Sequence, residues 1–276
     1  MSGLFAFLRR DIRAALAIAY LALLVLVAVA APWLSPYSPT AQNVNDMLAQ
    51  PSAAHWLGTD DLGRDILSRL IHGAPATIYA SLLAVGVAIL LGVPVGLAAG
   101  YFGGWIDDVI SRTIDTLLSF PAIVLAIAVT GALGIGLTNG MIAVGIVFAP
   151  QLARLARART LVVRHELYVD AARCFGASTP HILWRHVLPN AVQPVIVQVT
   201  LLLAAALLAE ASLSFLGLGV QPPHPSWGAM LARAYQAMDI APEQMYPPGL
   251  AILFTALAFN ALGESMRVAL DPTLKR

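Results

Sequence analysis

Few side chains in this 276-residue chain could make or break bonds. Its single cysteine is Cys174, and its histidines are spread without a spacing that suits a metal site. No H-E-x-x-H, G-x-S-x-G or G-x-x-x-x-G-K-[ST] pattern occurs, so the signatures of zinc proteases, serine hydrolases and nucleotide-binding loops are missing from the sequence. We therefore expect no catalytic residue, no metal site and no cofactor held by this chain.

Glu210 stands inside the apolar run 192–215, five residues before its end. An acid inside such a run is costly in a bilayer and by default marks a functional site. A hydrogen bond between helices, or a carboxylate that reaches the interface, accounts for it structurally. The functional alternative is a carboxylate at the external mouth of a polar pathway, where it would suit an ammonium group.

A short polar segment at 170–190 reads DAARCFGASTPHILWRHVLPN and interrupts a chain built largely of Leu, Ala, Val and Ile. Helix-forming residues lead to Gly176, which is placed to end a first helix. Thr179 can cap a second helix, with Pro180 at its first position, and Pro189 predicts its end. The predicted second helix gathers Ile182, Leu183 and Val187 on one face. Two interpretations stay open: the helix lies on lipid headgroups, or it inserts into a groove of a partner protein.

Composition indicates which elements must carry these residues. The chain is 59% hydrophobic and 11% charged, whereas soluble domains carry roughly 25% charged residues. A net charge of +1 argues against a nucleic-acid partner. The bilayer is therefore the expected solvent, and the expected fold class is an all-α polytopic membrane protein.

Six apolar runs are long enough to cross a membrane, which takes about 20 residues. We expect six transmembrane helices at 14–31, 77–100, 114–134, 138–161, 192–215 and 248–268. A Gly-rich link at 134–140 predicts that the third and fourth form an antiparallel hairpin. The first run follows Arg9, Arg10 and Arg13 like a signal peptide, but it is too long and lacks a small-residue cleavage site, so we interpret it as a retained span.

Basic residues predict the orientation, since Lys and Arg of short loops stay in the cytoplasm. With a cytoplasmic N-terminus, only Arg64, Arg69 and Arg233 of the 16 basic residues fall outside. We therefore expect both termini, and the segment 170–190, to face the cytoplasm.

The polar segment resembles the cytoplasmic loop of the membrane subunits of bacterial ABC importers. Their pattern is Glu-Ala-Ala, three residues, Gly, nine residues and Ile-x-Leu-Pro, and this chain has Asp170-Ala171-Ala172, Gly176 and Leu188-Pro189 at that spacing. It departs from the pattern at Asp170, which keeps the charge of Glu, and at His186, where Ile is usual and Val187 stands beside it.

Two further segments narrow the resemblance. The stretches 57–74 and 214–231, together with the ending NALGESMRVALDP, are similar to the C-type permease subunit of the dipeptide, oligopeptide and nickel importers. The resemblance covers essentially the whole chain and implies the type I ABC importer transmembrane fold. It divides the chain into a first span with an external loop (1–75), a permease domain (76–268) with a coupling loop (162–190), and a cytoplasmic tail (269–276).

The resemblance also implies the function and the partners. The chain would form half of the translocation pathway for di- or oligopeptides in a bacterial inner membrane. A related permease, two ATP-binding subunits that hold ATP and Mg, and an external substrate-binding protein would complete the complex. The implied ATPase-coupling loop comprises Asp170, Ala171, Ala172, Gly176, Thr179, Pro180, Ile182, Leu183, Val187, Leu188 and Pro189.

Other residues admit a structural and a functional interpretation. Gly92, Gly96 and Gly100 recur every four residues, which predicts close helix packing within the chain or against the partner permease rather than contact with cargo. Pro121 and Pro150 predict kinks or the lining of a water-filled cavity. Asp115 is expected to pair with Arg112.

The charged residues between 60 and 69 predict either an amphipathic helix on the membrane surface, such as DILSRLI over 65–71, or a contact with the binding protein. Cargo stays open between peptides, nickel complexes and haem. An ATP-independent channel or carrier is the competing class, but it gives the 165–190 loop no purpose, and no inverted repeat is visible.

Overall fold

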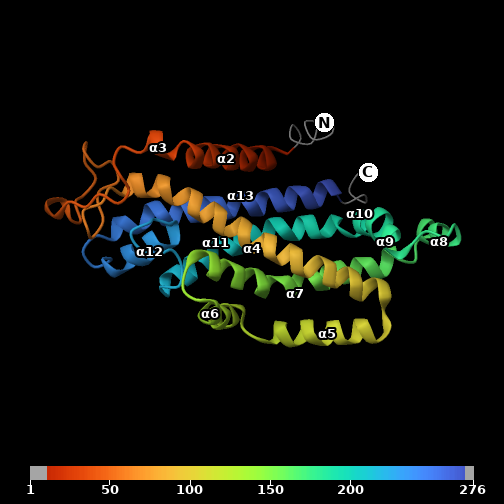
Figure 1. The fold of residues 1–276 in the computed structure, drawn as a ribbon. Helices are drawn as coiled ribbons and strands as arrows, with labels where there is room; N and C mark the ends of the chain where they lie inside the picture. Colours follow the sequence, from red (N-terminus) through yellow and green to blue (C-terminus); the bar gives the residue numbers. More distant parts are fainter. Residues whose placement is uncertain (1–10, 271–276) are drawn as a thin grey trace.

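The computed structural model describes residues 11–270, which form a bundle of helices that run back and forth along one long axis (Figure 1). Arg9, Arg10, Lys275 and Arg276, which entered the prediction of orientation, and most of the predicted tail lie outside the described residues. Five helices are long and apolar enough to span a membrane, and a sixth span is counted if one bent pair of helices is a single span.

The first helix, α2 (Ile12–Val29), is capped by Asp11, which accepts from the backbone N–H groups of Arg13 and Ala14. A hydrogen bond from Ser265 lowers the pKa of Asp11 below its usual value and ties the start of α2 to α13 (Tyr246–Leu270). A short α3 (Ala31–Leu34) and the turn η1 (Val44–Asp46) follow. Most of the outer face of α2 is exposed and apolar, as expected of a helix that faces lipid.

Helix α4 (Ile66–Phe102) has 37 residues, starts eleven residues earlier than the predicted span 77–100, and begins at the cap Asp65, which accepts from the N–H of Ser68. At 1.5 Å per residue it is about 55 Å long, more than the roughly 30 Å of a bilayer core. Its first turns therefore project beyond the apolar layer. The predicted surface helix over 65–71 is thus wrong, because those residues continue straight into the span.

The predicted third span is not one helix. α5 (Gly104–Ser119) and α6 (Ala122–Leu133) meet at Pro121 with a bend of 98°. Proline lacks the N–H that would continue the helix, and it pushes the residue before it into an extended conformation, here Phe120 with ψ of 141°. Figure 1 shows α5 alongside α7 (Leu137–Val163) and α6 nearly end-on, so only part of the predicted hairpin is antiparallel.

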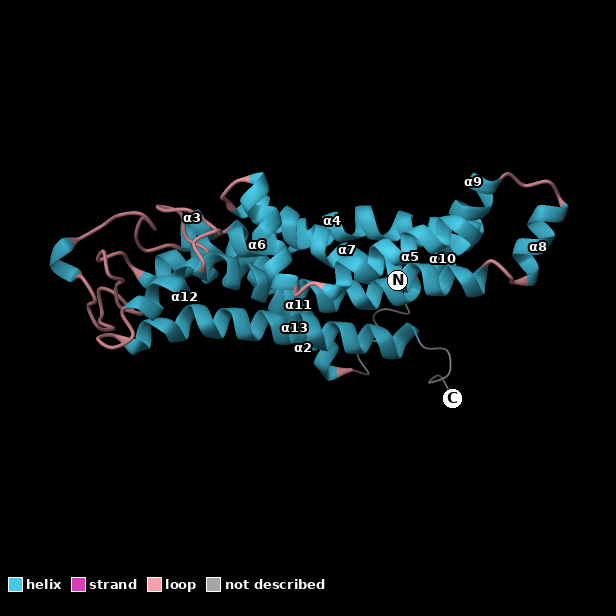
Figure 2. Cartoon of the chain, turned by 90° about the horizontal axis from the view of Figure 1, so that it is seen from below, coloured by secondary structure: helices cyan, strands magenta, loops and turns pink. Residues whose placement is uncertain are grey.

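At the far end of α7 the chain forms α8 (Leu167–Cys174), α9 (Thr179–Ile182), the π-helical turn η2 (Leu183–Val187) and α10 (Leu188–Ala191). It then returns through α11 (Gln193–Phe215), forms α12 (Trp227–Gln236) and η3 (Pro242–Met245) at the opposite end, and finishes with α13. Helices α8 and α9 stand at one end of the bundle, and α3 and α12 stand at the other (Figures 1 and 2).

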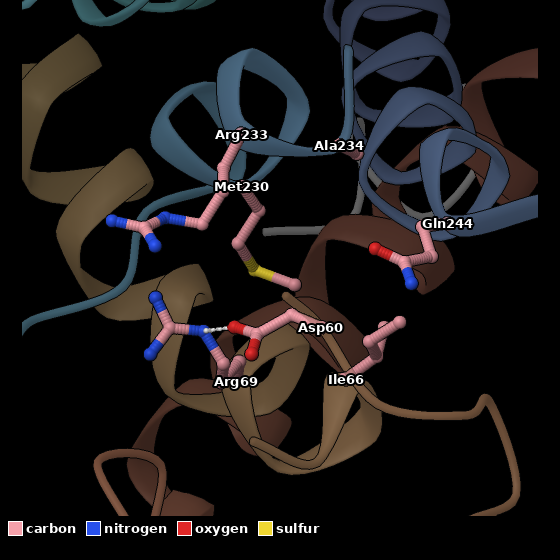
Figure 3. Close-up of a pocket in the computed structure, with 7 residues that line it drawn as sticks. All are labelled: Asp60, Ile66, Arg69, Met230, Arg233, Ala234 and Gln244. Carbon is pink, nitrogen blue, oxygen red and sulfur yellow. Dashed lines mark ion pairs between the residues drawn. The ribbon is translucent and has the colours of Figure 1, made fainter. Parts of the chain in front are cut away.

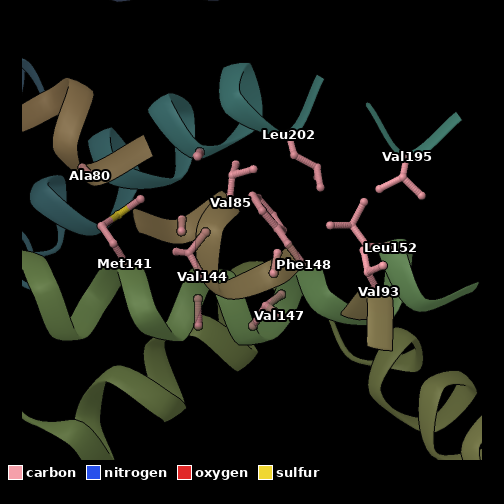
Figure 4. Packing of buried hydrophobic residues seen from close by; sticks show 14 of the residues in the cluster. Ala80, Val85, Val93, Met141, Val144, Val147, Phe148, Leu152, Val195 and Leu202 are labelled. Atoms are coloured by element: carbon pink, nitrogen blue, oxygen red, sulfur yellow. The ribbon is translucent and has the colours of Figure 1, made fainter. Parts of the chain in front are cut away.

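The main core lies between α4, α7 and α11 (Figure 4). Val85 of α4, Phe148 of α7 and Leu202 of α11 are among its buried members. A smaller cluster around Trp227 and Ile66 fills the end that carries α12, and a third around Val187 fills the end that carries α8. Each end of the bundle thus rests on its own apolar base, which holds the polar segments in place.

Candidate functional site

Helix α8 ends in a glycine motif that explains the spacing of the polar segment. Gly176 has a φ of +76°, which favours glycine. Its N–H donates to the carbonyl of Arg173, and the N–H of Ala177 donates to the carbonyl of Ala172. These two backbone hydrogen bonds satisfy carbonyls that the helix end would leave without a partner, and the chain turns sharply after them. Gly176 therefore ends the first helix, as the sequence predicted.

The second helix differs from its prediction at both ends. Ser178, not Thr179, precedes its first turn, because the N–H of Ile182 donates to the Ser178 carbonyl; Thr179 and Pro180 lie inside that turn. The helix also continues past Pro189 to Ala191 instead of ending there. The π-helical turn widens the helix, so that the N–H of Leu188 reaches the Leu183 carbonyl.

The helix around Pro189 has one more side-chain hydrogen bond. The side-chain Nδ2 of Asn190 donates to the His186 carbonyl at 2.7 Å. A proline inside a helix removes one N–H and crowds the carbonyl four residues before it, and the wider π-helical turn relieves that crowding. The proline therefore shapes this helix without ending it.

The apolar face predicted to enter a partner's groove lies against this chain. Ile182 is 2% exposed and Val187 is 0% exposed, and both pack with Val163 and Val169. Leu183 is half-buried on the same cluster. The prediction of a free Ile182–Val187 face is wrong because the side chains of α7 and α8 already cover it. These residues form the base on which the two helices are mounted.

Other apolar side chains point outward from this pair of helices. Leu167 is 85% exposed, Phe175 is 90% exposed and Trp184 is 73% exposed. Asp170 and the thiol of Cys174 are exposed as well. We call this set the outer rim. The sequence analysis missed its three apolar members, although a tryptophan and a phenylalanine within a polar segment were the available signal.

Two arginines hold the segment to the bundle. Arg164 donates through Nη1 to the carbonyls of Gly100 and Tyr101, at 3.0 and 3.2 Å, and so caps the end of α4. The guanidinium of Arg173 lies 5.5 Å from the centre of the Tyr101 ring, and it also pairs with Asp170 at 3.1 Å. Cations at the carbonyl end of a helix are favourable.

Burial and the charge of Glu166 raise the pKa of Tyr168, so this phenol in α8 stays neutral at physiological pH.

Glu210 is 1% exposed at the far end of α11. Its Oε1 accepts from the hydroxyls of Ser214 and Ser226, each at 2.8 Å, and Ser226 is the residue that caps α12. The carboxyl group therefore joins a span to the helix that follows it. This arrangement fits the hydrogen bond between helices that the sequence analysis gave as the structural interpretation.

The three predicted packing glycines belong to α4 and pack against α7 of the same chain. A Cβ atom on Gly92 would stand 2.4 Å from the Ala149 carbonyl oxygen, and one on Gly100 would stand 2.6 Å from the Thr160 Cβ. Pro150 lies buried in this seam, where it borders an open apolar pocket of about 280 Å³. Pro121 is exposed at the bend between α5 and α6.

The spacing of residues along the chain could not predict ion pairs between distant segments. Asp115 pairs with Arg154 of α7 and not with Arg112, because α5 folds back along α7. Arg157 of α7 donates to both carboxylate oxygens of Asp107, with Nη2 at 2.7 Å from Oδ2. These contacts bind the bent pair to the bundle.

The charged residues between 60 and 69 form a buried network at the end that carries α12. Arg64 is 1% exposed, and its Nη2 lies 2.7 Å from Oδ2 of Asp60. Nε of Arg69 lies 3.4 Å from the same oxygen, and Arg233 of α12 donates to Asp61 at 2.8 Å. Figure 3 shows Asp60 below Met230, between the side chains of Arg69 and Gln244.

Comparison with known proteins places this geometry among transport proteins. Residues 92–276 match the family described as "binding-protein-dependent transport system inner membrane component", and residues 5–51 match the N-terminal transmembrane domain of oligopeptide transport permease C. The glutathione transport system permease protein GsiD of Pectobacterium atrosepticum is 45% identical, over 98% of this chain and 91% of its own length. GsiD of an Escherichia coli strain is 46% identical, over 97% of this chain and 88% of its own length.

Solved structures show the same fold. Two crystal forms of the MetNI methionine ABC transporter, in inward-facing conformations, match with TM-scores of 0.58 and 0.60 at 20% sequence identity. Each match covers 75% of this chain and 98% of the other.

Proposed function

Because this chain belongs to the family of binding-protein-dependent transport system inner membrane components, as a permease subunit of an ABC importer, we propose that its cargo is glutathione and similar short peptides. Two similar relatives from different genera are named for glutathione transport, and they align over almost their whole length. The family implies ATPase and substrate-binding partners in general.

The complex we propose contains this chain, a second related permease, two ATP-binding subunits and an extracytoplasmic binding protein. This chain supplies half of the pathway. Its termini and the coupling loop 165–190 face the cytoplasm, and α12 with the loop before α4 faces outward. The ATP-binding subunits, and not this chain, hold ATP and Mg.

The exposure of the outer rim supports the proposal that this loop couples the chain to the ATP-binding subunits. Leu167, Phe175 and Trp184 are large apolar side chains that surround a helix pair at one end of the bundle, and each is more than 70% exposed. Exposed aromatic side chains such as Phe175 and Trp184 are enriched in protein–protein interfaces. The buried cluster around Val187 and the hydrogen bonds from Arg164 to α4 hold this pair of helices rigidly to the bundle. A push on the rim would therefore move α4 and α7 together.

Purification of the assembled transporter through a tag on this chain tests the proposal. We expect an ATPase to copurify, its activity to rise with the glutathione-loaded binding protein, and glutathione to enter proteoliposomes in the presence of ATP. Asp170→Arg and Gly176→Pro should abolish uptake while the protein stays in the membrane. Asp239→Arg, the same charge change at an exposed position at the other end, is the matched control. Uptake at the wild-type rate by both loop variants would show that coupling runs elsewhere.

A further inference from the structure

A cleft opens at the end of the bundle that carries α12. One wall is a face of α12, with Ala229, Ala232, Arg233 and Gln236 at helical spacing. The other wall is the segment 214–222, and Arg64 and Arg69 contribute from the region where α4 begins. The cleft has a volume of about 180 Å³ and is open to solvent, which gives room for a carboxylate group and the atoms next to it. The two alanines leave the room that larger side chains would fill.

The cleft is rich in groups that donate hydrogen bonds. Three arginines line it, and among its lining residues in the described part of the chain none is an aspartate or glutamate. The charged and strongly polar groups are Arg64, Arg69, Arg233, Gln221, Gln236 and His224. A concave site with this lining suits an anion, because guanidinium groups bind carboxylates in a two-pronged geometry.

The ion pairs behind the cleft do not use all the N–H groups of its arginines. Asp60 is shared by Arg64 and Arg69, and Asp61 pairs with Arg233. Two carboxylates thus face three guanidinium groups, each of which has five N–H donors. Asp65 nearby accepts from Ser68 and lies 2.9 Å from Nδ1 of His55. An anion in the cleft would accept hydrogen bonds from the N–H groups that remain.

Arg233 is the member that can reach a ligand. Its side chain is 29% exposed, and it donates to Asp61 through Nη1. Figure 3 shows the guanidinium groups of Arg69 and Arg233 pointing to the same side of the pocket, away from Gln244. Arg69 and Arg64 are buried and contribute positive electrostatic potential, whereas Arg233 and the exposed Gln236 stand at the opening of the cleft.

We propose that this cleft binds a carboxylate group of the cargo at the end of the bundle opposite the coupling loop. The proposal rests on the proposed function, since every peptide with a free C-terminus carries such a carboxylate. The concave shape favours a small anion over an acidic protein surface. The cleft would hold the cargo as it passes from the binding protein to the permease.

Direct binding tests the proposal without the binding protein. The assembled permease–ATPase complex in nanodiscs is titrated with glutathione and with dialanine, each as the free acid and as the methyl ester. Gln236→Glu adds a negative charge to the cleft without removing an ion pair, and Gln236→Lys adds a positive one. Gln50→Glu, the same change at an exposed position outside the cleft, is the control.

We expect the free acids to bind saturably and more tightly than the esters. Gln236→Glu should weaken binding at least tenfold, Gln236→Lys should strengthen it, and Gln50→Glu should leave it unchanged. The proposal fails if neither acid binds saturably, if the esters bind equally well, or if Gln236→Glu has no effect. Those results combined with intact ATP-driven glutathione uptake would overturn only the cleft, whereas absence of glutathione uptake by the wild-type transporter would overturn the proposed cargo.

Discussion

Gly96 of α4 lies so close to Ala153 of α7 that a Cβ atom on Gly96 would stand 2.3 Å from the Ala153 carbonyl oxygen. Small residues of this kind allow two helices to approach closely in a membrane, where dispersion contacts replace the hydrophobic effect as the driving force. Gly92 and Gly100 make the same approach one turn away on each side. The seam between α4 and α7 connects the two ends of the molecule.

Gly96→Val should separate these helices. Because the obstructing atoms are backbone, we expect a loss of about 1–3 kcal/mol or more, typical of an overfilled core. Thermal unfolding of the detergent-solubilised protein measures it. Gly86→Val in the same helix is the control, since no atom lies within 4 Å of its added Cβ. Equal stability of the two variants would contradict the seam.

Trp184→Ala and Ile182→Ala should fail in different ways, although the residues are neighbours on one short helix. Trp184 is 73% exposed, so its removal should lower ATP-driven uptake more than tenfold and leave the unfolding temperature unchanged. Ile182 is 2% exposed, and its truncation should cost about 2–5 kcal/mol of stability. Uptake and unfolding measured on the same preparations separate the two roles. Wild-type uptake by Trp184→Ala combined with Phe175→Ala would remove the outer rim from the mechanism.

Glu210→Gln should be tolerated much better than Glu210→Leu. Glutamine keeps an oxygen that accepts from Ser214 and Ser226, whereas leucine leaves both buried hydroxyls without a partner. Each lost partner costs about 1–3 kcal/mol. Because Ser226 caps α12, limited proteolysis should also cut the leucine variant faster within 216–236. Equal proteolysis of both variants would show that the carboxyl group does not hold α12.

Asp107→Ala should destabilise the protein more than Asp115→Ala. The Asp107 carboxylate is 15% exposed and receives two hydrogen bonds from Arg157, while the Asp115 carboxylate is 65% exposed. Charged hydrogen bonds contribute about 1.5–3 kcal/mol, and partial exposure places Asp107 at the low end of that range. Exposed ion pairs contribute about 0–1 kcal/mol. Double-mutant cycles with Arg157→Ala and Arg154→Ala measure the two coupling energies directly.

Cys174 allows a test of orientation with the native sequence. It is the only cysteine of the chain and is an exposed member of the outer rim. A maleimide that cannot cross membranes should label it in inside-out vesicles and not in intact cells or spheroplasts. A cysteine introduced at the exposed position Asp239 of a Cys174→Ser variant should show the reverse pattern. Labelling of Cys174 from outside would place the loop on the wrong side for any cytoplasmic ATPase.

Apolar run lengths were enough to predict a helical membrane protein, with every span except the bent third one near its observed place. Long apolar runs leave no other option in a bilayer, because every backbone polar group must be paired within its own segment. Gly176 was equally predictable, since only a left-handed φ closes that helix end so tightly. The resemblance to the importer loop was likewise visible in the sequence, at Asp170-Ala171-Ala172 and Leu188-Pro189.

Tertiary structure alone decided which surfaces remain free. Ile182 and Val187 had the spacing of a docking face, yet side chains of α7 and α8 bury them, and Leu167, Phe175 and Trp184 point outward instead. Asp115 had a partner three residues away but pairs with Arg154, because the bend at Pro121 lays α5 along α7. Of the three arginines of the cleft, Arg64 and Arg69 stand at the start of α4, and Arg233 of α12 follows them by more than 150 residues. Burial and pairing depend on which elements meet in space, and local periodicity contains no information on that.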